Sequence, residues 1–87
     1  MIQLWRNPQG HLVEVGDRDD VAALLGKSKR WAMTFHKYSI KGVPKTNPPP
    51  KPVTIDMDTH RYLWVLAECR AWEFRREGPG RRVQAVS

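Results

Sequence analysis

Three cations and a methionine recur at helical spacing in the stretch KRWAMTFHK. On a helix that turns by about 100° per residue, Lys29, Arg30, Met33, Thr34 and Lys37 fall on one side. Lysine and arginine bind phosphate oxygens and guanine edges, and an apolar side chain can contact the methyl group of thymine. This combination of residues predicts a helix face that enters the major groove of DNA.

Each of these residues also has a simpler interpretation. The cations can form a solvated lysine-rich surface, and Met33 can fill a gap beneath the segment 39–52. On the opposite side of the same helix, Trp31, Ala32, Phe35 and Tyr38 form an aromatic face. That face is predicted to contact the core, in preference to stacking on bases.

Charge is distributed unevenly along the chain. The net charge is +6, and residues 27–52 carry seven lysine and arginine residues with no acidic residue. A positive charge concentrated in one segment attracts polyanions. The candidate DNA contacts therefore also include Lys41 and Lys45 of this segment. Ser28 at the start of the same helix and Arg61 of the later hairpin complete the set.

Signals for catalysis or metal binding are poor. His11, His36, His60 and the single cysteine, Cys69, lack metal-ligand spacing, and no glycine-rich phosphate loop or nucleophile elbow occurs. We expect no enzyme activity, cofactor or metal. A single cysteine agrees with a reducing compartment, and no stretch has the roughly 20 apolar residues of a membrane span. The expected location is the cytoplasm, associated with the nucleoid.

The first half of the chain should contain two strands and two helices. Residues 1–16 predict two strands around a turn at 7–10, with Ile2 and Leu4 alternating on one strand and Val13 and Val15 on the other. Asp17 can cap a helix that ends at Gly26, and Ser28 a second helix to about Tyr38.

The second half begins with an extended connection, residues 39–52. Its prolines either keep the chain extended or form a ligand for an aromatic groove of a partner. Residues 53–64 predict a hairpin whose turn uses Asp56, Asp58 and Thr59. A last helix should span residues 65–77, with Trp64 and Trp72 packed around Cys69 and a flexible basic tail at 78–87. The sequence does not decide whether Trp5 covers the core or meets a partner subunit.

Together these elements predict one α+β domain over residues 1–77. Two helices joined by a short turn, then a hairpin and a helix, form a small winged helix-turn-helix. The predicted fold adds an N-terminal β-hairpin, a β-hairpin wing and a C-terminal helix.

Several motifs, in this order, resemble the small winged helix-turn-helix group of phage and plasmid excisionases, related to AlpA-type and MerR-type DNA-binding domains. They are VAALLGKS, PPPKPV, and RYLW followed by AECRAW, and the resemblance covers residues 19–76. It implies an architectural protein that binds double-stranded DNA beside an attachment site, bends it and helps an integrase to excise. Self-association on DNA stays open. The wing of the family is often basic, whereas this one carries Asp56 and Asp58.

Two other functions fit the same elements. A transcriptional regulator would use the same module and the same contacts. A protein-interaction module or phage packaging component that reuses a helix-turn-helix would instead expose aromatic residues around Trp5 or Trp31.

Overall fold

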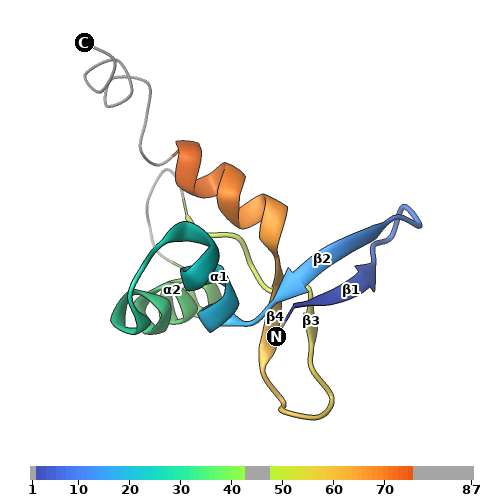
Figure 1. Cartoon of the computed structure of the whole chain (residues 1–87), viewed down its shortest axis with the longest axis horizontal. Coiled ribbons are helices and arrows are strands. Elements are labelled where there is room, and N and C mark those ends of the chain that lie inside the picture. Colours follow the sequence, from blue (N-terminus) through green and yellow to red (C-terminus); the bar gives the residue numbers. More distant parts are fainter. Residues whose placement is uncertain (1, 43–47, 76–87) are drawn as a thin grey trace.

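The computed structural model describes residues 2–42 and 48–75 (Figure 1). It contains the strands β1 (Gln3–Arg6) and β2 (Leu12–Gly16), the helices α1 (Arg18–Leu25) and α2 (Lys29–Lys41), and the strands β3 (Thr54–Ile55) and β4 (Tyr62–Val65). A C-terminal helix follows at residues 66–75. The predicted α+β fold is confirmed, with both hairpins and all three helices in the expected order. Lys45, the predicted stop of the last helix and the basic tail lie outside the described residues.

The four strands form one antiparallel sheet in the order β1-β2-β4-β3. In the first hairpin Trp5 pairs with Val13 and Gln3 with Val15, so these residues share the inner face of the sheet. Ile2 and Leu4, which alternate in the sequence as an apolar face would, point to the exposed face. Leu4 and Trp5 are adjacent, so only one of them can face inward, and the register with Val13 selects Trp5.

The first helix begins with reciprocal capping. Asp17 accepts a hydrogen bond from the Asp20 amide at 2.9 Å, and the Asp20 carboxylate accepts one from the Asp17 amide at 3.0 Å. Gly26 ends the helix in the left-handed conformation, at φ 68°, where residues other than glycine are strained. Ser28 then caps α2 by accepting a hydrogen bond from the Trp31 amide. The helix-turn-helix therefore forms at the residues that the caps predicted.

The second helix is longer than predicted. It continues through Ser39, Ile40 and Lys41 and ends at Gly42, so the expectation that residues 39–41 are extended was wrong. Ser39 is buried, and its hydroxyl donates to the carbonyl of Pro50 and accepts from the indole nitrogen of Trp64 at 2.8 Å. These long-range hydrogen bonds stabilise Ser39 within the last turn of α2, although serine otherwise prefers helix caps and turns.

The proline segment is fastened to the core. The Pro50 carbonyl also accepts from the Trp64 indole at 3.1 Å, and Pro49, Pro50 and Pro52 are half-buried. These contacts support a structural role for the prolines over a role as a ligand for a partner.

The second hairpin and last helix each differ from the prediction at one end. The alternation of Val53, Ile55 and Met57 predicts that all three lie on one strand, but Met57 lies in the turn beyond β3. Val65 belongs to β4, so the C-terminal helix begins at residue 66. Val65 pairs with Val15 of β2, and this long-range pairing outweighs the helical pattern of the sequence.

The core has two apolar clusters. One joins both helices of the helix-turn-helix to the C-terminal helix through Val21, Phe35, Trp64, Leu66, Cys69 and Trp72. The prediction that Trp64 and Trp72 pack around Cys69 is confirmed. The other cluster lies under the sheet, where Trp5 packs against Val15, Leu63 and Val65. Trp5 therefore covers the core. Among the described residues, no helix is both long and apolar enough to cross a membrane.

Candidate nucleic-acid interface

The outer face of α2 carries the residues predicted to meet DNA. Lys29, Arg30, Met33, Thr34 and Lys37 are all exposed, and Met33 is 59% exposed. That exposure contradicts the alternative in which Met33 fills a gap beneath the segment 39–52. The face is therefore available to a ligand along about two turns of the helix.

The opposite face of α2 holds the helix against the domain. Ala32 and Phe35 are buried, and Trp31 stacks on Phe35 with ring centroids 5.2 Å apart. Tyr38, which was placed on this face, is 38% exposed and lies at its edge. Trp31 is half-buried against the core cluster, which favours the packing role over stacking on bases.

The two hydroxyl groups at the outer, exposed face of α2 already take part in hydrogen bonds of the helix. Ser28 caps α2, and the Thr34 hydroxyl donates to the Arg30 carbonyl at 3.2 Å. Lys41 is exposed in the last turn of α2, at the edge of this surface.

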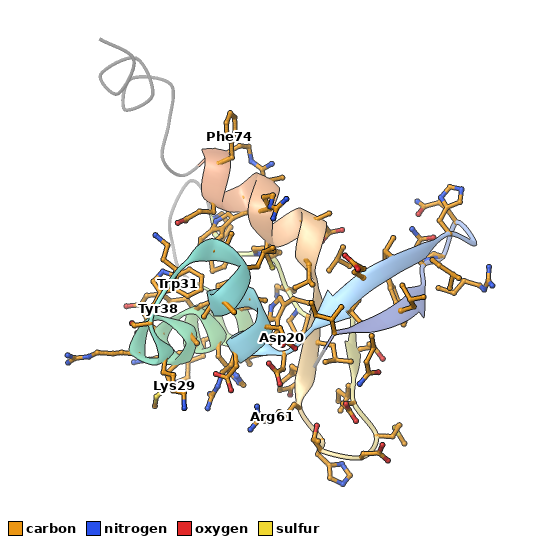
Figure 2. The ribbon with its side chains drawn as sticks, viewed as in Figure 1. Asp20, Lys29, Trp31, Tyr38, Arg61 and Phe74 are labelled. Atoms are coloured by element: carbon orange, nitrogen blue, oxygen red, sulfur yellow. The ribbon has the colours of Figure 1, made fainter. Side chains whose placement is uncertain are left out.

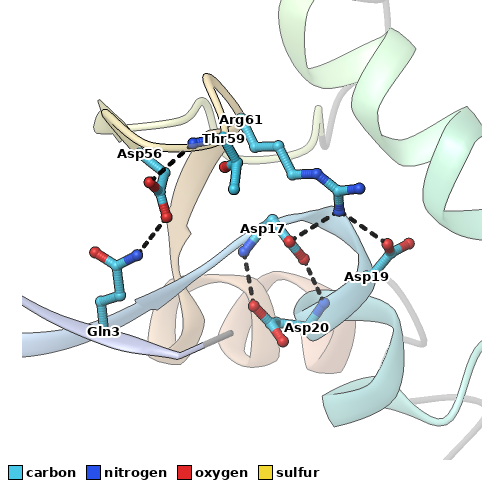
Figure 3. Close-up of polar contacts among 7 residues, drawn as sticks. All are labelled: Gln3, Asp17, Asp19, Asp20, Asp56, Thr59 and Arg61. Atoms are coloured by element: carbon cyan, nitrogen blue, oxygen red, sulfur yellow. Dashed lines mark hydrogen bonds and ion pairs between the residues drawn. The ribbon is translucent and has the colours of Figure 1, made fainter.

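Arg61 differs from the other predicted contacts because it is paired with acids. Its Nη1 atom lies 3.0 Å from an Asp17 carboxylate oxygen and 3.1 Å from one of Asp19, and these ion pairs join the second hairpin to the start of α1 (Figure 3). Burial raises the pKa of Asp17, but the Asp20 amide and the Arg61 guanidinium outweigh it, so this pKa is lowered overall. Arg61 is therefore partly neutralised within the protein.

The turn of the second hairpin, the wing at residues 56–61, is organised by Asp56. One oxygen of its carboxylate accepts hydrogen bonds from the amides of Asp58 and Thr59. The other accepts from the side chain of Gln3 on β1, and Figure 3 shows the contacts of Asp56 with Thr59 and Gln3. The predicted turn chemistry is confirmed. Asp58 is exposed, so the wing surface carries acidic charge.

The wing and α2 face the same side of the domain. In Figure 2, Lys29 and Arg61 both lie on the lower side, and Phe74 of the C-terminal helix lies at the opposite end. A surface that approaches α2 from below would therefore meet the wing as well.

A cleft of about 210 Å³ opens between α2, the start of α1 and the wing. Its lining residues are Asp17, Arg18, His36, His60, Arg61, Tyr62 and Trp64. Sequence reasoning considered the histidines only as metal ligands and missed this grouping. His36 and His60 are far apart in the sequence, and only the packing of α2 against β4 brings them to one cleft.

The described residues hold no group of three or more histidine, cysteine or acidic side chains suited to a metal ion. No family model, curated protein or solved structure matches the chain.

Proposed function

We propose that this protein is a sequence-specific DNA-binding protein that inserts α2 into the major groove. The observation that carries the proposal is the exposed face of α2, where Lys29, Arg30 and Lys37 surround Met33 on a helix whose other side is buried. An α-helix fits the width of the major groove, and cations on its outer face can meet both phosphates and base edges.

The composition around α2 supports this assignment. No acidic residue occurs between residues 27 and 52, so nothing within this segment repels the DNA backbone. Five of the nine acidic residues lie instead at the start of α1 and in the wing, and two of these, Asp17 and Asp19, are paired with Arg61. We therefore assign the main contacts to α2 and only a minor share to the wing.

The more specific role in this proposal is that of an excisionase. It rests on the motifs of residues 19–76, and its partners would be double-stranded DNA and an integrase. A transcriptional regulator with the same module would make the same contacts, and an adjacent integrase gene would favour the excisionase. The protein-interaction alternative requires an exposed aromatic patch at Trp5 or Trp31, and both side chains are half-buried against the core.

The proposal is tested by duplex binding across a salt series. Lys29→Ala, Arg30→Ala and Lys37→Ala should weaken binding, and each lost phosphate contact should reduce the slope of log K against log salt by about 0.9. Arg70→Ala is a matched control, because Arg70 is an exposed cation on the C-terminal helix. Unchanged affinity and slope in all three α2 variants would contradict the assignment.

Met33 tests sequence recognition separately from phosphate binding. Met33→Ala should relax the preference at one A·T position by about 1 kcal/mol, because only a thymine methyl offers the thioether an apolar partner in the groove. Affinity for random DNA should barely change. A selected-site competition with melting temperatures alongside distinguishes this effect from a loss of stability.

A further inference from the structure

The cleft between α2 and the wing has the chemistry of an anion site. It brings together two guanidinium groups, Arg18 and Arg61, with the imidazoles of His36 and His60 and the phenol of Tyr62. Its one carboxylate, Asp17, already accepts hydrogen bonds from the Asp20 amide and from Arg61. Cationic and hydrogen-bond-donating groups from three elements therefore face one opening.

Arg61 is held in position by its ion pairs. The hydrogen bonds of Arg61 to Asp17 and Asp19 both use the Nη1 atom, while a guanidinium carries five N–H donors in a fixed plane. The carboxylates thus orient the group and leave donors for a further acceptor. Such a pre-oriented guanidinium suits the tetrahedral oxygens of a phosphate.

His36 connects the cleft to the face of α2. It follows Met33 by three residues, so the two side chains are neighbours on the helix surface. The His36 ring packs edge-to-face with the rings of Tyr62 and Trp64, and the ring centroids are 5.6 Å and 5.7 Å apart, respectively. These contacts hold His36 beside the wing. A DNA strand lying along α2 would pass the mouth of the cleft.

We propose that this cleft binds one phosphate group of a nucleic-acid backbone, held by Arg18, Arg61 and the imidazole of His36. This inference deepens the proposed function and rests on it for the source of the phosphate. A free phosphate ion has the same chemistry, so the test includes both.

Binding of a phosphate by His36 is linked to proton uptake. In the free protein, burial and the nearby Arg18 lower the pKa of His36, so the ring is neutral near neutral pH. The other titratable and charged groups that face His36 across the cleft are Asp17, His60, Arg61 and Tyr62. A phosphate bound there would add negative charge, which favours the imidazolium form of His36. The imidazole then takes up one proton from the buffered solvent and gains a second N–H bond as the phosphate enters, and no covalent bond to the phosphate forms.

The sign of the linkage sets the expected pH dependence. Affinity should rise as the pH falls through the pKa of His36 in the complex, and should level off below its lower pKa in the free protein. One proton taken up limits this rise to about tenfold per pH unit.

The experiment measures duplex affinity at constant ionic strength from about pH 8 to about pH 5.5, the range in which histidine titrates. We expect the wild type to bind more tightly at low pH and His36→Gln to lose most of that increase. His11→Gln is the matched control, because His11 is exposed on the first hairpin, outside the cleft, and it should keep the full increase.

A second measurement uses the wild type, so its result does not depend on whether a variant folds. It also separates the phosphate-site proposal from the proposed DNA-binding function. The NMR titration midpoint of His36 in the wild type should move to higher pH when inorganic phosphate replaces chloride at equal ionic strength. If DNA binds but neither the pH dependence nor this midpoint involves His36, the cleft is not a phosphate site. If DNA fails to bind at any pH while phosphate still raises the midpoint, the cleft stands and the proposed function falls.

Discussion

At the end of β2, alanine in place of Gly16 would press a methyl group against the first turn of α1. A Cβ on Gly16 would lie 2.6 Å from the Cβ of Asp20, where ordinary contacts begin at 3.4 Å. Neither β2 nor the first turn of α1 can shift without disturbing its own hydrogen bonds. Gly16 is paired with Trp64 in the sheet, and Asp20 exchanges capping hydrogen bonds with Asp17.

The magnitude follows from three opposing effects. Overpacking a rigid contact costs about 1–3 kcal/mol. Loss of the capping hydrogen bonds adds about 0.5–2 kcal/mol, if α1 shifts to relieve the collision. Against these, replacing glycine by alanine reduces the entropy of the unfolded chain and returns about 0.4–1 kcal/mol. We expect Gly16→Ala to lower the free energy of unfolding by about 2 kcal/mol, which for a domain of this size lowers the melting temperature by roughly 8–16 °C.

Thermal and urea denaturation measure this loss, and a double-mutant cycle identifies its cause. In an Asp20→Gly background the atoms that collide are absent, so Gly16→Ala should cost nothing further or should stabilise slightly. A variant Gly16→Ala as stable as the wild type would refute the close approach of β2 to α1. So would an equal cost in both backgrounds.

Three further substitutions or conditions test the core and the titration of the site. Phe35→Ala should destabilise the fold by about 3–5 kcal/mol in urea denaturation, because the ring is buried between the helices and the sheet; a loss below 1 kcal/mol would contradict this packing. Ser39→Ala should cost only about 1 kcal/mol, because the Trp64 indole keeps the Pro50 carbonyl as acceptor; a much larger loss in thermal melts would show that the shared hydroxyl is indispensable. His36 has a lower pKa in the folded than in the unfolded protein, so its contribution to stability is full above about pH 6.5 and is lost as the pH falls towards the folded pKa. Melting temperatures of the free protein should therefore fall on acidification, and less steeply in His36→Gln.

The helices of this protein were predictable because their signals are local. Asp17, Gly26 and Ser28 mark the ends of α1 and the start of α2 through contacts within a few residues. The wheel of α2 separated buried Phe35 from exposed Met33 correctly, since a period of 3.6 residues depends only on the helix itself.

What the sequence did not reveal depends on residues far apart along the chain. The last turn of α2 forms because Ser39 reaches Pro50 and Trp64, and no pattern near Ser39 signals these partners. The face of β1 is set by its register against β2, and the grouping of His36 with the wing is set by how α2 packs on β4. Periodicity cannot predict such long-range choices.

The wing is tied to the body of the domain at two points, through Arg61 to the start of α1 and through Asp56 to β1. Such ties oppose hinge motion of the wing relative to the start of α1 and to β1, so the wing would keep a nearly fixed position when the protein meets DNA. In the proposed complex, any mismatch of shape would then have to be taken up by bending or twisting of the duplex. The elastic cost of that deformation differs among base steps, so in the proposed complex a stiff protein of this kind would discriminate among sequences at base pairs that it never touches.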